Sequence, residues 1–208
     1  AIGTELGKGK ESDVFVAYDE ERKALVAKVH RVGRPSFQRS KKLRVYVGKR
    51  GHINWLYKSR LSAERECEGL TIANKLKAKV PKVIDNNRHV VVMEFYDGTE
   101  LVNFPELKKP IKIFNGIISE IQKLFLKGHI VHGDLSEYNI IITPKQDFIL
   151  IDFPQFLKAD HINASEFLLR DIKNICRYFK KEYRVESSPK LIHKLILEDY
   201  EKEEKKRK

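Results

Sequence analysis

The chain has 208 residues, of which 41% are hydrophobic and 34% are charged, and this composition predicts a soluble, globular protein. No stretch approaches the roughly 20 consecutive apolar residues of a membrane-spanning helix, and the amino terminus lacks the pattern of a signal peptide, so we expect a cytoplasmic protein without membrane association. The only two cysteines, Cys67 and Cys176, are too few for a disulfide framework or a cysteine-based zinc site.

The amino-terminal residues predict β-strands around a glycine-rich loop. Runs rich in β-branched residues at 14–18 and 25–29 flank the charged turn 19–23, which is typical of a hairpin. In the loop before them, Gly7 and Gly9 allow the backbone to approach phosphates, and Ser12 can donate a hydrogen bond. Two glycines alone more often form a simple turn, so the loop gains meaning only from the motifs that follow.

Lys28 places a positive charge inside the otherwise apolar strand 25–29. A buried, unpaired ammonium is costly, so Lys28 needs an acidic partner. Apolar residues at helical spacing predict a helix at about 60–77, and Glu66 shares its inner side with Leu70 and Ala73. We therefore predict a Lys28–Glu66 ion pair that holds the α and β phosphates of a nucleotide.

Most of the net charge of +12 lies in one stretch, because residues 31–60 contain ten Lys or Arg and no Asp or Glu. The simplest interpretation is a solvated loop. Aromatic residues between the charges favour a second interpretation, contact with a polyanion such as RNA, since rings stack on bases while cations neutralise phosphates.

The remaining elements alternate short strands with longer helices. Pro110 suits a first helical turn, and an apolar stripe follows it as far as Gly128. The last residues, 198–208, are almost all charged and are expected to be frayed. The other expected elements are strands at 83–84, 89–94, 140–142 and 148–151, a turn at 85–88, and helices at 165–181 and 189–199.

Two motifs in the second half carry the chemistry of phosphoryl transfer. Asp134 and Asn139 lie five residues apart in the segment 132–139, a spacing that lets a carboxylate orient the attacking hydroxyl or water while an amide oxygen reaches a metal. Asp152 follows the next strand, so Asn139 and Asp152 can converge on one Mg²⁺, which prefers oxygen ligands. We interpret His132 as a packed, hydrogen-bonded residue, since phosphoryl transfer asks little of a base beyond orientation.

The segment after Asp152 departs from ordinary protein kinases. Only about ten residues precede the next helix and no Ala-Pro-Glu follows, so the platform on which a peptide substrate lies is missing. Pro154 also stiffens the loop. These features indicate a slow ATPase or a self-phosphorylating switch as much as a kinase that acts on another protein.

The loop 7–15, the segment 132–139 and the run 151–155 together resemble the RIO family of atypical serine/threonine protein kinases. The Asp-Phe-Pro-Gln sequence at 152–155 and the segment 55–63 resemble its second subfamily, whose members normally carry a winged-helix domain before the kinase domain. The resemblance runs from about Gly3 to Tyr183. It implies an α+β, bilobal protein-kinase-like fold with a reduced activation segment: a small antiparallel-sheet N-lobe with one helix at 1–96, and a mainly helical C-lobe at 97–208.

The resemblance also assigns roles to residues. It makes Lys28 and Glu66 the ion pair, Asp134 the catalytic carboxylate, and Asn139 and Asp152 the ligands of Mg²⁺ or Mn²⁺. Met93 would close the back of the adenine pocket, and the main chain of Glu94 and Tyr96 would read the adenine edge. Asp171 would support the catalytic-loop backbone, although a surface pair with Arg170 is the simpler alternative. The remaining expected ATP contacts are Gly7, Gly9, Lys10, Ser12, Val26 and Ile151.

The function implied is an ATP- and Mg²⁺-dependent kinase or ATPase in maturation of the small ribosomal subunit, with the basic stretch 31–60 contacting ribosomal RNA or the pre-ribosomal surface. For this subfamily the resemblance also implies phosphorylation of Asp152 itself. A use of the basic stretch that competes with RNA contact is self-phosphorylation at Ser36 or Ser40. Two alternatives stay open: another small kinase-like phosphotransferase, of the KEOPS, aminoglycoside or choline type, and a catalytically inactive RNA-binding scaffold.

Overall fold

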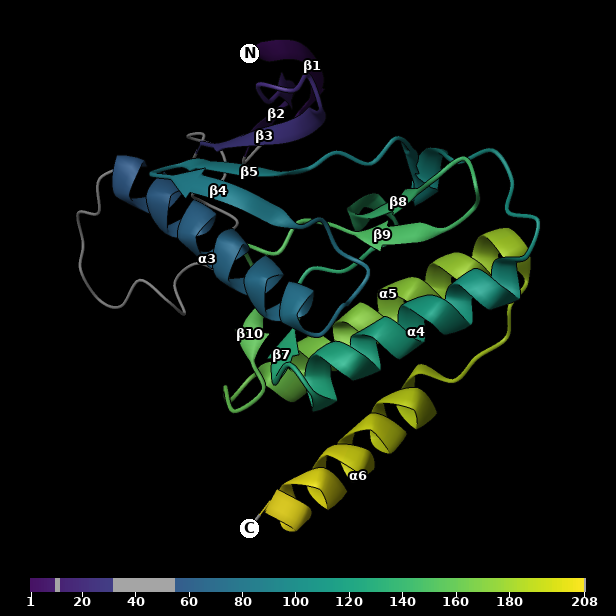
Figure 1. Cartoon of the computed structure of the whole chain (residues 1–208). Helices are drawn as coiled ribbons and strands as arrows, with labels where there is room; N and C mark the ends of the chain where they lie inside the picture. The colour runs from purple at the N-terminus through teal and green to yellow at the C-terminus, as the bar shows by residue number, and fades with distance from the viewer. Residues whose placement is uncertain (10–11, 32–54, 208) are drawn as a thin grey trace. The chain divides into compact units, whose positions relative to one another are not determined.

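The computed structural model describes residues 1–9, 12–31 and 55–207, and these form two compact units. The first unit contains residues 1–68 and 82–95, and the second contains residues 69–81 and 96–208. Figure 1 shows the elements of both units.

An antiparallel sheet of five strands, in the order β1-β2-β3-β5-β4, forms most of the first unit. Lys28 and His30 are two residues apart on β3, so their side chains emerge on the same face. They bond Glu66 of helix α3 (Trp55–Lys75), so this face of β3 is the one that meets the helix. The strands are β1 (Ile2–Lys8), β2 (Ser12–Tyr18), β3 (Ala24–His30), β4 (Val83–Asn87) and β5 (Val90–Glu94).

Three helices build the core of the second unit: α4 (Pro110–Leu126), α5 (Ala164–Tyr183) and α6 (Pro189–Arg207). Each packs against the other two. Helix α4 begins at its proline and buries the predicted apolar stripe, including Ile117 and Leu124. The rings of Phe114 on α4 and Phe179 on α5 meet edge to face at 5.4 Å.

Short strands carry the loops of the candidate site. A three-stranded sheet has the order β6-β8-β9, and a two-stranded sheet joins β10 to β7. Two single 3₁₀ turns, η1 (Leu101–Asn103) and η2 (Glu137–Asn139), complete the unit. The strands are β6 (Thr99–Glu100), β7 (Ile130–Val131), β8 (Ile140–Ile142), β9 (Phe148–Leu150) and β10 (Leu157–Lys158).

The largest differences from the predicted element boundaries are at the start of α3 and at the ends of β4 and α6. Helix α3 begins at Trp55 rather than near 60, and its first turn exposes Leu56 and Tyr57, so it has no inward apolar stripe to reveal it. Strand β4 continues through the predicted turn 85–88 as far as Asn87, because its backbone pairs with β5 while its side chains face solvent.

The charged carboxyl-terminal segment was predicted to fray, and this prediction is wrong, because α6 continues to Arg207. The ring of Tyr200 packs against Phe125 of α4, with ring centroids 4.9 Å apart. Ion pairs at helical spacing, Lys194 with Glu198 and Lys202 with Asp199, support the exposed side. No helix in the described part of the chain is both long and apolar enough to cross a membrane.

Candidate active site

A buried cluster of three side chains marks the first unit. The Lys28 ammonium donates to Oε1 of Glu66 at 2.7 Å, so the predicted ion pair is present. A third member, His30, was not predicted from the sequence, and its Nε2 lies 2.6 Å from Oε2 of Glu66. The relative exposures of Lys28, His30 and Glu66 are 8%, 3% and 0%, so water does not compete for these bonds.

The charges around Glu66 decide its ionisation. Burial alone would raise the pKa of its carboxyl group, but the positive charge of Lys28 and the hydrogen bond from His30 lower the pKa to about 2. Glu66 is therefore a carboxylate at neutral pH, and His30 must be the donor in the bond that they share, because a carboxylate only accepts.

The predicted nucleotide-binding residues of the first unit lie on neighbouring strands. Val26 of β3 is paired directly with Met93 of β5, which is buried. Gly9 follows β1, and its N–H donates to the carbonyl of Ser12, the first residue of β2, at 2.8 Å. The Glu94 N–H donates to the Lys82 carbonyl at 2.9 Å, so only its carbonyl would be suited to read an adenine edge.

Other predicted ATP contacts fall elsewhere. Tyr96 and Ile151 belong to the second unit. Gly7 is the penultimate residue of β1, and a side chain there would meet no atom within 4 Å. Lys10 lies outside the described residues, as does the part of the basic stretch from 32 to 54.

A buried carboxylate organises the loop that carries Asp134. Asp171 of α5 is 1% exposed and accepts two backbone hydrogen bonds, from Gly133 at 2.7 Å and from Leu135 at 3.1 Å. Its two oxygens thus hold the residues on either side of Asp134. Of the two interpretations of Asp171, support of the loop backbone is therefore the one that the contacts match.

Neighbouring residues of α5 complete this support. The Arg170 guanidinium donates to the Gly133 carbonyl and lies 3.8 Å from a carboxylate oxygen of Asp134. Asn174, one turn along the helix, donates to the Leu135 carbonyl at 3.0 Å. Asp134 itself remains 44% exposed on its side chain, so the backbone around it is fixed while its carboxylate faces solvent.

Gly133 is required by the shape of the loop. Its φ is +81°, and a Cβ atom there would lie 2.3 Å from the Gln155 carbonyl oxygen. Only glycine tolerates both the backbone angle and the close approach. The segment after Asp152 is thereby brought directly against the start of the loop that carries Asp134.

His132 is buried and hydrogen-bonded, as expected from the sequence. Its Nε2 donates to the Ile151 carbonyl at 3.0 Å, and its Nδ1 accepts from the Asp134 N–H at 3.3 Å. This pattern corresponds to the neutral ring with its proton on Nε2. His132 also packs on Phe153, with ring centroids 4.4 Å apart, so it ties the residues on both sides of Asp152 to the loop that carries Asp134.

Asn139 and Asp152 are held close by the hairpin of β8 and β9. The Ile151 N–H donates to the Asn139 carbonyl at 3.0 Å, which places Asp152 one residue beyond that bond. The Asn139 amide nitrogen donates to the Asp134 carbonyl at 2.8 Å, so its side-chain oxygen is on the other side of the amide group. Asp152 has a φ of +72°, a strained angle for a residue with a side chain and one that often marks a functional position.

These donors fit Mg²⁺ that is bound together with a phosphate. Across residues 1–9, 12–31 and 55–207, no group of three or more His, Cys, Asp or Glu side chains could hold a metal ion by itself. Mg²⁺ at nucleotide sites takes one or two protein oxygens and completes its shell with water and phosphate oxygens. An amide oxygen from Asn139 and a carboxylate from Asp152 meet that requirement.

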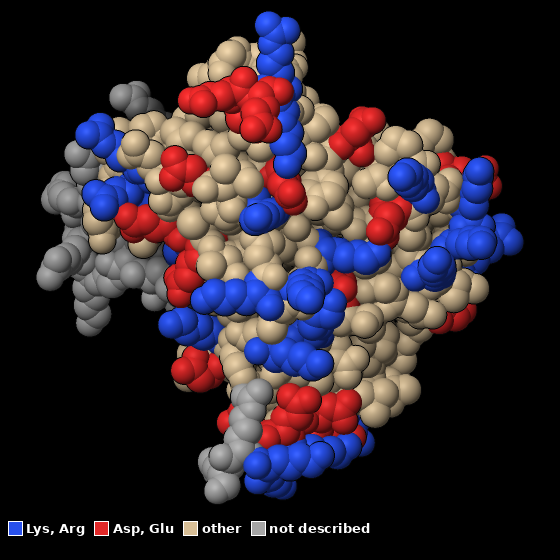
Figure 2. All heavy atoms as spheres, viewed as in Figure 1, with Lys and Arg blue, Asp and Glu red and all other residues tan. Residues whose placement is uncertain are grey.

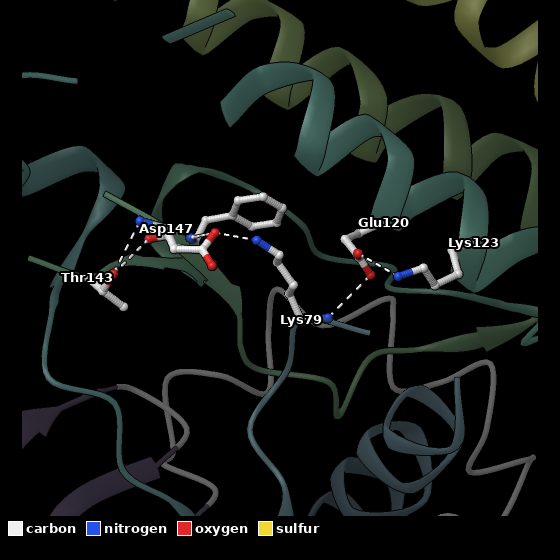
Figure 3. Close-up of polar contacts among 6 residues, drawn as sticks. Lys79, Glu120, Lys123, Thr143 and Asp147 are labelled. Carbon is white, nitrogen blue, oxygen red and sulfur yellow. Dashed lines mark hydrogen bonds and ion pairs between the residues drawn. The ribbon is translucent and has the colours of Figure 1, made fainter. Parts of the chain in front are cut away.

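A second network fastens strand β9, which leads to Asp152 (Figure 3). The Lys79 carbonyl accepts a hydrogen bond from the Leu150 N–H at 2.8 Å. The backbone N–H of Lys79 donates to Glu120 of α4 at 3.3 Å. The Lys79 ammonium pairs with Asp147, the residue directly before β9, and lies 4.7 Å from the centre of the Phe148 ring. Lys123 neutralises the buried Glu120 at 2.6 Å. Charge patterning did not reveal this network, because Lys79 and Asp147 are 68 residues apart.

The chain matches a family model described as the RIO domain over residues 13–191. It is 43% identical to the RIO-type serine/threonine-protein kinase Rio2 of Methanocaldococcus jannaschii over 199 residues, which covers 92% of this chain and 72% of that protein. It is also 37% identical to the serine/threonine-protein kinase RIO2 of Caenorhabditis elegans, covering 90% of this chain but 35% of the longer relative.

Solved structures agree with the sequence relatives. The Rio2 kinase of Chaetomium thermophilum, in a complex with ADP, Mg²⁺ and phosphoaspartate, has a TM-score of 0.77 at 31% identity, covering 93% of this chain and 61% of that one. A second crystal structure of that kinase gives a TM-score of 0.78. These matches confirm the predicted fold class, α+β and protein-kinase-like with a five-stranded antiparallel sheet.

Proposed function

Because this chain belongs to the RIO domain family of atypical serine/threonine protein kinases, we propose that it is an ATP- and Mg²⁺-dependent phosphotransferase of the Rio2 type. The observation that carries the proposal is the buried Lys28–Glu66 pair. A buried ion pair is a poor source of stability compared with apolar packing, so its presence favours a use for the ammonium. Binding the phosphates of ATP is that use.

We assign each proposed role to residues within one unit. In residues 1–96, the proposed N-lobe, Lys28 holds phosphate oxygens, the loop from Gly7 to Ser12 approaches them through its backbone, and Val26, Met93 and Glu94 contact adenine. In residues 97–208, the proposed C-lobe, Asp134 orients the attacking oxygen, while Asn139 and Asp152 bind Mg²⁺. Bound Mg²⁺ supplies positive charge against the developing negative charge of the transferred phosphoryl group.

The short segment after Asp152 favours the protein itself or water as the acceptor of the phosphoryl group. Eleven residues, 153–163, separate Asp152 from α5, and part of them forms β10 against β7. The phosphoaspartate in the Chaetomium thermophilum complex supports Asp152 as an acceptor. In a transfer to Asp152, one of its carboxylate oxygens would form a bond to the γ-phosphorus of ATP as the bond between that phosphorus and the leaving oxygen of ADP breaks. Water would later hydrolyse the acyl phosphate.

We also propose that the basic stretch 31–60 contacts ribosomal RNA or a pre-ribosomal surface, and that the protein acts in the cytoplasm on the small ribosomal subunit. The charge supports this proposal, because the stretch carries ten positive residues without one acid. On the face shown in Figure 2, blue and red side chains are instead interspersed. At the described ends of the stretch, Arg31 pairs with Asp13 and Arg60 with Glu64.

The catalytic proposal is tested by ATP turnover and by transfer of the γ-phosphoryl group, in the presence and absence of Mg²⁺. Parent protein should bind nucleotide and turn it over only with the metal. Asp134→Asn should keep nucleotide binding but lose at least 90% of turnover, about tenfold or more, because the carboxylate orients the acceptor and does not hold ATP. Equal turnover of parent and variant would contradict the assignment.

The RNA proposal is tested by affinity at several salt concentrations. If the stretch neutralises phosphates, log affinity should fall with log salt at a slope of about −0.7 per phosphate engaged on a single strand. A variant in which Lys41, Lys42, Arg44, Lys49 and Arg50 are replaced by Gln should bind more weakly and with a shallower slope. Equal affinities and slopes would exclude this stretch as the RNA contact.

A further inference from the structure

His30 is a buried titratable residue that the proposed reaction does not yet use. It lies on β3, two residues after Lys28, and its side chain is only 2% exposed. It shares Glu66 with Lys28, but each takes a different oxygen: Lys28 bonds Oε1 at 2.7 Å and His30 bonds Oε2 at 2.6 Å.

The second bond changes what the carboxylate can do. An ammonium on a flexible stem holds a carboxylate as a point charge and permits it to rotate. When His30 donates to the other oxygen, the hydrogen bonds at both oxygens together set the plane of the Glu66 carboxylate. The buried Oε2 would also lose a partner without His30, and leaving such an atom unsatisfied is costly.

The backbone of His30 is itself rigidly held, which makes the residue suited to this task. Its N–H donates to the His89 carbonyl at 2.7 Å, and on the other side it is paired with Ser12 of β2. A ring on a fixed strand presents its Nε2 at one place. The Lys28 ammonium then meets a carboxylate whose position does not vary.

We infer that His30 is a positioning residue for phosphoryl transfer: it holds Glu66 in the one orientation from which Glu66 directs the Lys28 ammonium to the phosphates of ATP. This inference rests on the proposed function, because it assigns His30 a role through Lys28. His30 makes no contact with the nucleotide in this role. Its removal should therefore weaken the use of ATP while Glu66 and Lys28 remain in the protein.

The test compares His30→Ala, His30→Gln and His30→Asn in the full chain, at a temperature well below the melting temperature of each variant. His30→Ala should lower kcat/KM for ATP about tenfold, as the loss of a supporting hydrogen bond to a catalytic group does. His30→Gln should restore it to within about twofold of the parent, because the glutamine amide nitrogen lies near the place of Nε2. The shorter His30→Asn should not restore it.

Two further variants separate positioning from a structural role. His89→Gln changes a histidine next to His30 whose side chain is not among the described hydrogen-bond partners of Glu66. The variant keeps the backbone carbonyl that His30 uses, and its kcat/KM should equal that of the parent. In a Lys28→Met background, His30→Ala should cause no further loss, since His30 acts only through Lys28. Residual turnover in that background can be measured with radiolabelled ATP.

The outcomes are distinguishable from failure of the proposed function. If Lys28→Met lowers kcat/KM but His30→Ala equals the parent, the inference is overturned and the proposed function stands. The same holds if Gln and Asn are equally impaired, or if His30→Ala loses the same factor with and without Lys28. If Lys28→Met itself has no effect, the proposed site fails and the inference fails with it.

Discussion

Two buried carboxylates organise the two units, and they are held in opposite ways. Glu66 is surrounded by the cation Lys28 and the donor His30, and its pKa is lowered to about 2. Asp171 accepts backbone N–H groups from Gly133 and Leu135, and burial raises its pKa to about 7 despite those bonds and the nearby charge of Arg170. Burial is nearly complete at both positions, so the charge of the partners makes the difference.

The comparison shows what each carboxylate is suited to do. A carboxylate beside a cation keeps its charge and can fix an ammonium that binds phosphate. A carboxyl group bonded to neutral N–H groups sets the path of the backbone, and it needs no full charge for that. The Glu66 carboxylate is therefore suited to holding a cation. The Asp171 carboxyl group is suited to holding the backbone of the loop that carries Asp134.

The largest loss of stability is expected from removing the ammonium of Lys28, which lies beside Glu66. Lys28→Met should destabilise the protein by about 3 kcal/mol, at the lower end for a broken buried pair because His30 still bonds Glu66. Methionine keeps the length of the aliphatic stem, so the loss reports charge rather than packing. Urea unfolding followed by circular dichroism measures it.

The double variant Lys28→Met, Glu66→Gln is the control for this prediction. It removes the negative charge of Glu66 that Lys28 no longer compensates, so part of the lost stability should return. If the double variant is less stable than Lys28→Met alone, the cost does not come from an uncompensated carboxylate.

Removing the Asp171 carboxyl group should lower the stability less than removing the Lys28 ammonium does, but it should clearly lower turnover. Asp171→Ala removes the acceptor of two buried N–H groups and should cost about 1–3 kcal/mol. Turnover should fall together with it, because Asp134 lies between Gly133 and Leu135. The exposed Asp160→Ala, a matched loss of one carboxylate, should change stability by less than about 0.5 kcal/mol. An Asp171→Ala protein with parental turnover would show that the loop keeps its shape without this support.

The two carboxyl groups should give opposite dependences of stability on pH. The folded pKa of Glu66 lies below its usual value of 4.5, so its contribution is present above that pH and is lost as the pH falls toward about 2. The folded pKa of Asp171 lies above its usual value of 3.8, so the folded state keeps a proton that the unfolded state releases, and stability declines as the pH rises from there to about 7.

Unfolding free energies of the parent, Glu66→Gln and Asp171→Asn between pH 2 and 8 test this contrast. Glu66→Gln should flatten the acidic part of the profile, and Asp171→Asn the part between about 4 and 7. The carboxyl carbon resonances of the two residues report the same pKa values directly. A carboxyl resonance of Asp171 that titrates near its usual pKa would remove the contrast.

The smallest stability effect is expected at Asp152, the proposed ligand of Mg²⁺. Asp152→Ala should abolish Mg²⁺-dependent nucleotide binding while changing stability by less than about 0.5 kcal/mol, since the side chain serves the ion. Asp152→Gly should be more stable than Asp152→Ala by about 1 kcal/mol, because glycine adopts the φ of +72° without strain. Retained Mg²⁺ dependence in either variant would show that another residue binds the metal.

The sequence by itself determined the elements that depend on local patterns. The stripe of α4 after Pro110 appears as predicted, because burial at helical spacing is legible in a single segment. The Lys28–Glu66 pair was also predictable, since a charge inside an apolar strand requires an acidic partner and only one nearby glutamate faced inward. The order of the motifs was enough to indicate the family.

Only the tertiary structure decided the partners of these residues. His30 is the last residue of β3, and its place in the sequence carries no signal that it bonds Glu66, 36 residues away. Asp171 and Arg170 are neighbours in sequence, yet Asp171 accepts a hydrogen bond from the Gly133 N–H and Arg170 donates one to the Gly133 carbonyl. Hydrogen bonds between distant segments depend on how the strands and helices pack, and the side chains that form them have no periodicity that a sequence could display.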